Sequence, residues 1–284
     1  MKNFKQYFKL YFLLFLVIIN ILIFYAVAHT SPDKMKVDFF DVGQGDAIFV
    51  TAPGGVQMLV DGGPDNSVLR ELGQVMPFYD RSIDVVVATH ADQDHIGGLV
   101  EVLKRYNVGL VVLNNTTSTS AVYAEFTDLI KAKNIKEEVI IKPEIIALGS
   151  EVEFDILFPN QNTAGWETND SSIVGKLIYG ENSVLLTGDS PLAVEKYIMG
   201  KYGNFLKSDI LKVGHHGSKN SSSDIFIGTV LPAYSVISVG LDNRYGHPAP
   251  EALAILNKYK TKILETLGEG MIRFETDGKN IYNY

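Results

Sequence analysis

The chain has 284 residues, of which 46% are hydrophobic and 20% are charged, with 25 glycines and 10 prolines. This composition excludes disorder, collagen and coiled coil, and the length suffices for one large domain with a sizeable core. The 33 acidic and 25 basic residues give a formal charge of −8, which excludes the broad basic surface that binds DNA non-specifically, and the absence of cysteine excludes disulfides and thiolate zinc sites.

The first element is an apolar segment, Leu10 to Ala28, which carries no charge and follows Lys2, Lys5 and Lys9. It is long enough to cross a bilayer as a helix, and the lysines before it predict a cytoplasmic N-terminus with the rest of the chain outside. Because residues 26–28 have the small-x-small form of a signal-peptidase site, cleavage near Ala28 would instead release a secreted protein. The length of the apolar region favours an uncleaved anchor, and its uniform apolarity disfavours a buried core helix.

These features divide the chain into a cytoplasmic basic N-terminus at 1–9, a transmembrane anchor or signal at 10–28, a linker at 29–35 and a folded domain at 36–284. Three of the 25 basic residues belong to the first part, so the folded domain keeps 22 basic and 33 acidic residues, a net charge of −11. We therefore expect a protein of the cell membrane whose domain is extracytoplasmic and distinctly acidic.

Beyond the linker, short β-branched or aromatic runs alternate with amphipathic stretches, separated by glycine turns. The expected strands lie at 37–41, 47–51, 58–61, 85–89, 110–113, 151–158, 173–179, 183–187, 210–213, 234–239 and 271–275. The expected helices lie at 99–106, 121–133, 191–202 and 250–259, and Gly54-Gly55 predicts a hairpin. This order indicates an α/β domain with more than one sheet or one large mixed sheet.

The segment after the apolar strand at 85–88 holds four potential metal ligands within six residues: His90, Asp92, Asp94 and His95. Imidazole and carboxylate ligands together suit Zn, Mn or Fe. In a loop, the first two can point to one centre and the last two to a second, while Gly97 and Gly98 let the backbone approach the metals. A solvated turn with an aspartate helix cap is the plain alternative, but such a turn does not need four ligand residues in succession.

Three later segments place further ligand residues after strands or in loops. Asp189 follows a buried strand and a glycine, where it could equally cap a helix that starts near Pro191. His215 and His216 stand between glycines at the end of the 210–213 strand. His247 precedes a proline and lies close to Arg244, which could clamp a phosphate or carboxylate, although a surface loop with a casual histidine also explains this segment.

Together these residues resemble the signature of the metallo-β-lactamase fold superfamily, and they are most similar to its ComEC-type branch. The branch motifs are Asp-Val-Gly-Gln-Gly-Asp-Ala at 41–47, Val-Asp-Gly-Gly at 60–63, His-x-Asp-x-Asp-His at 90–95 and Gly-His-His-Gly-Ser at 214–218. The resemblance spans 37 to about 275. It implies an α/β fold, a four-layer αββα sandwich, with two divalent metal ions, Zn or Mn, at one edge of the sheets.

The resemblance also implies a role for each matching residue. In the first site the metal is held by His90 and Asp92. In the second it is held by Asp94, His95 and His215, while Asp189 bridges the two ions and Asp61 orients a ligand histidine. Two departures matter: Asp92 stands where most of the superfamily has histidine, and the usual third histidine of the first site is missing. Its place falls in the 168–172 stretch, so the candidate substitutes are Asp170 and Asn169, with His216 and His247 as alternatives.

The implied activity is hydrolysis at a dinuclear centre, with a phosphodiester as the expected substrate. Water between the metals, oriented by Asp94, is the expected nucleophile, and His247 with Arg244 faces the substrate. We expect an extracytoplasmic phosphodiesterase or nuclease, with single-stranded DNA as a candidate substrate. The alternatives are a hydrolase of wall-polymer phosphoesters of the teichoic-acid type and a catalytically inert metal-binding module for competence or assembly.

The sequence holds no signal for a protein partner, and the membrane is the one partner that the apolar segment implies. Full competence-channel proteins of the branch that it resembles also carry a multi-helix membrane domain. One apolar span does not form a channel, so we expect a stand-alone hydrolase domain.

Overall fold

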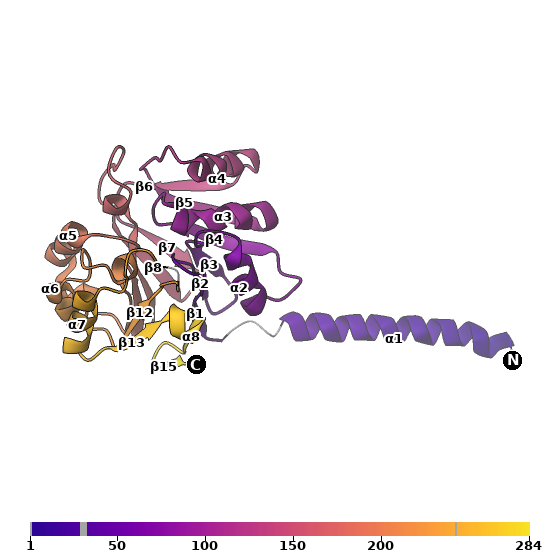
Figure 1. Ribbon diagram of the computed structural model, residues 1–284. Coiled ribbons are helices and arrows are strands. Elements are labelled where there is room, and N and C mark those ends of the chain that lie inside the picture. The colour runs from indigo at the N-terminus through magenta and orange to yellow at the C-terminus, as the bar shows by residue number, and fades with distance from the viewer. Residues whose placement is uncertain (1, 29–32, 242) are drawn as a thin grey trace.

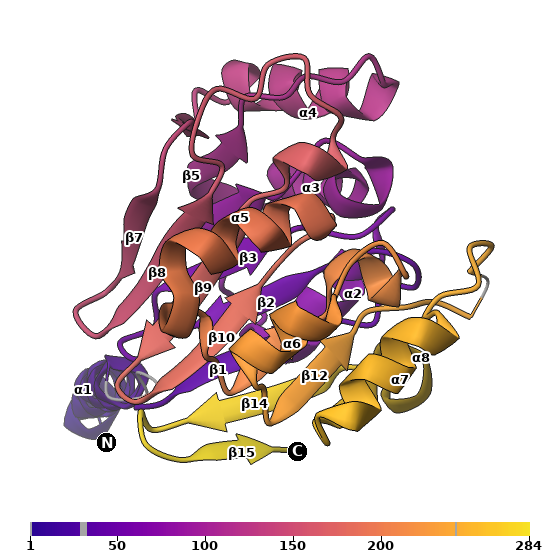
Figure 2. The ribbon, with the colours of Figure 1, turned by 90° about the vertical axis from the view of Figure 1, so that its left-hand side faces the viewer.

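The structure, a computed structural model, describes residues 2–28, 33–241 and 243–284 (Figure 1). In these residues the chain forms a long N-terminal helix, α1 (Lys2–Ala28), and a domain of two β-sheets that lie face to face with helices on their outer sides (Figures 1 and 2). This is the four-layer αββα sandwich expected from the motifs.

The first sheet contains eight strands within the described residues, in the order β15-β14-β1-β2-β3-β4-β5-β6. Their bounds are β1 (Met35–Phe39), β2 (Ile48–Thr51), β3 (Gln57–Val60), β4 (Ser82–Ala88), β5 (Asn107–Asn114), β6 (Lys136–Ile140), β14 (Ile272–Thr276) and β15 (Ile281–Asn283). Strands β3 to β6 run parallel to one another. Their carboxyl ends therefore meet at one edge, where loops commonly carry a site.

The second sheet contains seven strands within the same described ranges, in the order β13-β12-β11-β10-β9-β8-β7. Their bounds are β7 (Glu144–Leu148), β8 (Val152–Phe158), β9 (Val174–Tyr179), β10 (Asn182–Leu186), β11 (Ile210–Lys212), β12 (Tyr234–Ile237) and β13 (Lys262–Glu265). Strands β10 to β13 are parallel. The carboxyl ends of β10 and β11 lead into the residues 189 and 215–216 that the sequence singles out.

Helices cover the outer face of each sheet. The first sheet is covered by α2 (Ser67–Val75), α3 (Gln93–Arg105) and α4 (Ala121–Ala132), and the second by α5 (Leu192–Tyr202), α6 (Asp224–Val230) and α7 (Pro250–Lys258) (Figure 2). The remaining short elements are α8 (Thr266–Glu269), η1 (Asn169–Ser171), η2 (Gly203–Leu206) and η3 (Gly214–Gly217).

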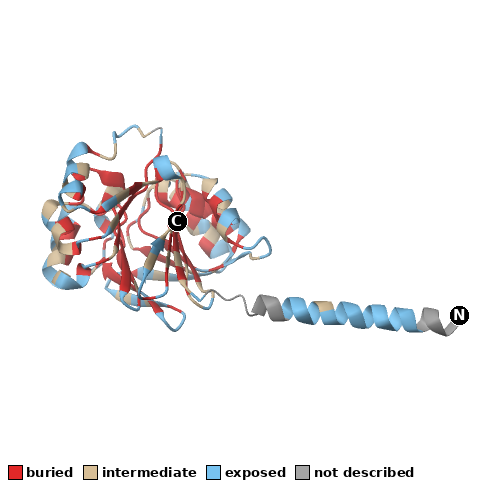
Figure 3. Ribbon diagram, turned by 90° about the horizontal axis from the view of Figure 1, so that it is seen from below, coloured by how far each residue is buried: buried red, intermediate tan, exposed pale blue. Residues whose placement is uncertain are grey.

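Three apolar clusters hold these layers together, one between the sheets and one beneath each helical layer (Figure 3). Strand β4 shows why its sequence is a continuous apolar run. Val85 and Val87 point into the cluster between the sheets, whereas Val86 points into the cluster under α3. A strand buried on both faces needs apolar residues at successive positions.

Helix α1 lies apart from the domain, and its described side chains are almost all exposed (Figure 3). Its window Tyr7–Phe24 has a mean hydropathy of 2.4, and none of that window is buried. By length and composition it could cross a membrane, and a signal sequence would pass the same test. Of the expected linker, residues 29–32 lie outside the described residues, and β1 already begins at Met35.

The structure corrects several expected elements. The helix expected at 99–106 begins at Gln93, so Asp94 and His95 lie in the first turn of α3 and not in a loop. The sequence reading missed both strands between 136 and 148, helices α2 and α6, and strands β13 and β15. The hairpin at Gly54-Gly55 is confirmed, since β2 and β3 pair antiparallel across it.

Candidate metal centre

The 90–95 run is placed by the junction of β4 and α3. Asp92 occupies the N-cap position of α3, but its side chain makes no capping hydrogen bond. The plain alternative, in which an aspartate serves only to cap the helix, is therefore not what Asp92 does. Its carboxylate lies 3.6 Å from Nε2 of His90, and Asp94 and His95 project from the next turn.

Gly97 and Gly98 serve a different purpose from the one expected. A Cβ on Gly98 would lie 1.9 Å from the carbonyl oxygen of Gly62, and one on Gly97 would lie 2.1 Å from that of Pro64. The two glycines thus let the start of α3 pack against the loop after β3. The Gly62 amide stabilises this close approach by donating to the His95 carbonyl at 2.7 Å. The approach brings Asp61 beside the His95 ring.

Asp61 organises two histidines. Its Oδ1 accepts from the Thr89 amide at 2.8 Å, and its Oδ2 accepts from the Thr89 hydroxyl at 2.7 Å and contacts Nδ1 of His95 at 2.8 Å. Because the Thr89 hydroxyl donates to Asp61, it accepts at 3.0 Å from Nδ1 of His90. Both rings therefore carry a proton on Nδ1, and Nε2 is the ring atom that each directs into the site for binding a metal.

The second sheet supplies the other half of the site. Asp189 follows β10 through Gly188, and its amide donates to the Ser172 hydroxyl at 3.3 Å. His215 and His216 both adopt left-handed backbone conformations, with φ of 48° and 53°. This turn aims Nδ1 of His216 at the Ser238 carbonyl, 2.9 Å away. A carbonyl only accepts, so Nδ1 of His216 carries a proton and Nε2 is the atom that can bind a metal.

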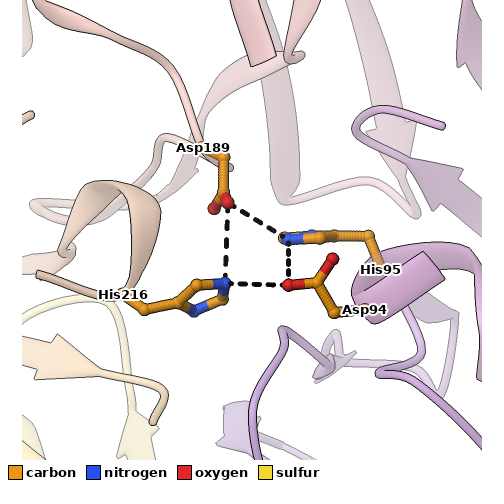
Figure 4. Close-up of side chains that lie close together, drawn as sticks. All are labelled: Asp94, His95, Asp189 and His216. Carbon is orange, nitrogen blue, oxygen red and sulfur yellow. Dashed lines mark ion pairs between the residues drawn. The ribbon is translucent and has the colours of Figure 1, made fainter. Parts of the chain in front are cut away.

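Four ligand residues converge between the sheets. Asp94, His95, Asp189 and His216 each offer one atom, and these atoms lie within 4.8 Å of one another (Figure 4). Oδ2 of Asp189 is 3.5 Å from Nε2 of both His95 and His216, and Oδ2 of Asp94 is 3.5 Å from Nε2 of His216. The cluster joins α3 of one sheet's layer to two loops of the other.

The donor set fits a divalent metal ion. Nε2 of His90, His95 and His216 and Oδ1 of Asp189 are buried and have no hydrogen-bond partner among the described residues. Buried polar atoms normally have a hydrogen-bond partner, so four such atoms without one indicate a site that binds a cation. Imidazole and carboxylate donors of this kind suit Zn, Mn or Fe.

The structure separates the other sequence candidates. The ring of His90 is tilted against that of His95, with centroids 4.0 Å apart, and His90 forms a smaller group with Asp92 beside the cluster of four. Asn169 in η1 has a buried Oδ1 without a described partner, whereas Asp170 is exposed and lines a different cavity. His215 is partly exposed and lies 3.8 Å from Asp189, so the structure brings His216, not His215, into the cluster of four.

The burial and the charges of the cluster shift the pKa values of its members in different directions. Burial lowers the pKa of His95, but the charges of Asp189 and Asp61 outweigh it and raise that pKa well above the usual value. Burial and the neighbouring His95 lower the pKa of His90 to about 4. Burial opposes ionisation of Asp94, yet His216, whose Nε2 lies 3.5 Å from Oδ2 of Asp94, and the charge of His95 bring the pKa of Asp94 down to about 2. The carboxylates around His95 thus favour a positive charge at this point of the site.

A cleft of about 1080 Å³ opens beside the cluster. Asp94 and Arg244 both line it, together with Gln44, Gln93 and Tyr245. His247 stacks on Tyr245, with ring centroids 5.7 Å apart, and lies 5.6 Å from the ring of His215. The loop that carries the expected substrate-facing residues therefore borders the same cleft as Asp94.

The family model described as Metallo-beta-lactamase superfamily matches residues 40–240. The chain belongs to the metallo-beta-lactamase superfamily. It is 31% identical over 256 residues to ComE operon protein 3 of Bacillus subtilis, covering 84% of this chain and 33% of that protein. It is 30% identical over 246 residues to competence protein ComA of Neisseria gonorrhoeae, covering 85% of this chain and 32% of that protein.

These relatives place the chain in the ComEC-type branch of the superfamily, as its motifs indicate. The chain spans about a third of their length. Among solved structures it resembles CmlA, a diiron β-hydroxylase from Streptomyces venezuelae, with a TM-score of 0.55 and 16% identity over 87% of this chain and 54% of that one. It also resembles Zn²⁺-bound PqqB from Methylobacterium extorquens, with a TM-score of 0.51 and 13% identity over 81% and 97%. Both likenesses concern the fold.

Sequence reasoning missed one part of the site, a buried ion pair behind His216. Lys212 and Asp46 form it, with Nζ 2.6 Å from Oδ2, and Oδ1 of Asp46 lies 3.5 Å from Nδ1 of His216. Lys212 also donates to the Val213 carbonyl at 2.9 Å. Asp46 belongs to the 41–47 motif, and Lys212 precedes the 214–218 motif. The signal for the pair was Lys212, a charged residue in an otherwise apolar strand.

Proposed function

We propose that this chain is an extracytoplasmic, dinuclear metal-dependent hydrolase of phosphodiesters, a phosphodiesterase or nuclease. The observation that carries the proposal is the set of orphaned, buried nitrogen and oxygen atoms of His90, His95, His216 and Asp189, which faces the space next to an open cleft. When bound, two divalent ions supply Lewis acidity and a water that ionises near neutral pH. Zn and Mn both suit the donors.

The chain's own residues divide the work as follows. His90 and Asp92 hold one ion, with Asn169 as the candidate additional ligand. Asp94, His95 and His216 hold the other, and Asp189 lies between the two groups. His215, which the resemblance assigned to the second ion, stands at the rim beside His247. Asp61 holds His95 directly and His90 through Thr89.

Three side chains act on the substrate. Asp94 belongs to the cluster and lines the cleft, so its carboxylate can orient the attacking water. Arg244 lines the same cleft, and its guanidinium can stabilise charge that develops on the phosphoryl oxygens. His247 stacks on Tyr245 of the same cleft, and burial with the charges of His215 and His216 lowers its pKa, so its uncharged ring can stabilise the developing charge by donating a hydrogen bond.

The membrane placement rests on α1. The three lysines at its start, followed by an uncharged apolar helix, favour a cytoplasmic N-terminus and an external domain. N-terminal sequencing of the mature protein tests this part. A chain that starts at Met1 supports the anchor, and one that starts at His29 supports secretion after cleavage.

The activity is tested with the full chain in detergent, loaded with Mn or Zn. We expect hydrolysis of bis(p-nitrophenyl) phosphate and of a single-stranded oligonucleotide, a loss of at least about 100-fold in kcat for Asp94→Ala, and no change for Asp128→Ala on the exposed face of α4. Hydrolysis of a teichoic-acid polymer but of no oligonucleotide would favour the wall-polymer enzyme. Wild type and Asp94→Ala that bind metal and are equally inactive on all three substrates would favour the inert module.

A further inference from the structure

A second cavity, of about 600 Å³, lies away from the cleft of the metal cluster and shares no lining residue with it. Its walls come from the end of β8, the loop that follows and the first turns of α5. Three aromatic rings line it: Phe158, Trp166 and Tyr197. Phe158 is buried, with its centroid 6.4 Å from Trp166 and 5.8 Å from Tyr197. Trp166 is the chain's single tryptophan and is 36% exposed.

The cavity is tied to the metal centre through both of its flanking segments. Asp170 of η1 lines the cavity, and it follows Asn169, the candidate additional ligand. Ala193 and Val194 line it from α5, which begins just after Asp189. The cavity thus lies on segments that also carry residues of the metal centre.

A second hollow continues the cavity along α5. It has a volume of about 530 Å³ and shares Ala193 and Tyr197 with the aromatic cavity, but it adds Lys196 and Lys201. Lys201 lies over the rings of Tyr197 and Tyr202. Lys196 is exposed and makes no ion pair among the residues that the structure describes. The acidic domain thus places two lysines beside an aromatic surface, and one of them, Lys196, is exposed.

Aromatic faces next to lysines match one type of ligand, a polyanion that carries flat heterocycles. Bases stack on aromatic side chains irrespective of sequence, and lysines follow the phosphates. We propose that the aromatic cavity and the lysine hollow form a subsite for an unpaired nucleic-acid strand, with a base stacked against Trp166 and a neighbouring phosphate at Lys196. This rests on the proposed function, of which it names the substrate class.

The acidic groups in the cavity refine the proposal. Glu167 and Asp170 line it with the amides of Asn160 and Gln161, and no basic residue does. Carboxylates repel phosphate, so the phosphate belongs at the lysines and the base in the cavity. They accept hydrogen bonds from exocyclic amino groups, such as N4 of cytosine. A base in a duplex cannot enter, because its edge and both faces are already engaged.

The single tryptophan gives a direct assay of occupancy. Full chain in detergent with EDTA is titrated with a cytosine oligonucleotide, with an abasic oligomer of equal length and with duplex DNA, and Trp166 fluorescence is recorded. We expect quenching by the cytosine strand and binding at least about tenfold weaker for the abasic strand and the duplex, since stacking contributes about 1–3 kcal/mol per base. Equal binding of the abasic and cytosine strands, or no quenching, would overturn the subsite.

Variants separate the two parts of the subsite. With a labelled oligonucleotide, Trp166→Ala should lower affinity by about tenfold and Trp166→Phe should largely restore it, because a ring returns. Lys196→Ala should lower the slope of log affinity against log salt by about 1, and the exposed Lys142→Ala on the β6–β7 connection should leave it unchanged. A Trp166→Ala protein that binds like wild type, or equal slopes for both lysine variants, would refute the assignment.

The same set distinguishes failure of the subsite from failure of the proposed function. Quenching is measured without metal and without turnover. Quenching by single strands with no hydrolysis of any phosphoester would support the subsite and refute the proposed hydrolase activity. Hydrolysis of bis(p-nitrophenyl) phosphate without quenching would refute the subsite and support the proposed hydrolase activity.

Discussion

The ion pair of Lys212 and Asp46 offers the sharpest test of how the two sheets support the metal centre. Asp46 lies between β1 and β2 of the first sheet, and Lys212 ends β11 of the second. Their charged atoms are 2.6 Å apart, and the side chains are 0% and 2% exposed. Lys212→Met would leave Asp46 as a buried carboxylate with no cation, behind the ring of His216.

The expected cost follows from burial. Removing one partner of a buried ion pair costs about 3–5 kcal/mol, because the remaining charge keeps its desolvation penalty. For a domain of this size, this corresponds to a fall in Tm of about 6–20 °C. The pair Lys258 and Asp224 is the matched control, since its Nζ–Oδ distance is also 2.6 Å but the side chains are 59% and 48% exposed. Lys258→Met should cost at most about 1 kcal/mol.

The assay is thermal unfolding of the full chain in EDTA, followed by circular dichroism, so that lost metal does not contribute. The double variant Asp46→Asn with Lys212→Met should recover part of the loss, because the unpaired charge is removed. A Tm for Lys212→Met that falls no further than that of Lys258→Met, or a double variant less stable than Lys212→Met alone, would refute the reasoning.

Asp61→Asn should weaken metal binding by about 10- to 100-fold, because His95 and Thr89 lose their shared acceptor; competition with a metal indicator measures this, and unchanged affinity would contradict the assigned role. Metal binding should release protons and tighten as pH rises through and above the usual histidine range, since Asp189 outweighs burial and raises the pKa values of His95 and His216 in the metal-free site. Calorimetry in two buffers of different ionisation enthalpy detects the release, and equal affinity at about pH 6 and 8 would count against it. Gly98→Ala should destabilise the domain by about 1–3 kcal/mol or more, because its Cβ would clash with the Gly62 carbonyl. Gly73→Ala in α2 is the control: its Cβ would meet nothing within 4 Å, so it should stabilise the domain by about 0.5–1 kcal/mol. Equal unfolding midpoints for the two variants would contradict this packing.

Much of the layered fold could be read from local patterns. The run Val85 to Ala88 is apolar at every position because both faces of β4 are buried, and such a run is visible without coordinates. Strands β6 and β7 escape the sequence analysis because little of either is buried, and in β7 only Leu148 is. The sequence of β6 is Lys-Glu-Glu-Val-Ile, and only its last residue is buried. Edge strands exposed on this scale carry too weak a periodicity to be recognised.

The start of α3 shows a different limit. The run His-Ala-Asp-Gln-Asp-His was read as loop, yet Gln93 to His95 are helical. Aspartate, histidine and paired glycines are poor helix formers, so propensity argued against a helix there. The helix forms because Gly97 and Gly98 pack against the backbone of residues 62–64, a contact between segments over 30 residues apart that no local pattern encodes.

The sequence by itself determined the types of ligand residue, their positions at strand ends and the apolar N-terminal segment, because these depend on side-chain chemistry and on local periodicity. Tertiary structure decided which atoms meet. Two left-handed residues in succession turn His216 inward and leave His215 at the rim, and a lysine 166 positions after Asp46 neutralises it in the interior. Side-chain direction depends on backbone angles and on packing across the two sheets, and neither is written in the spacing of residues along the chain.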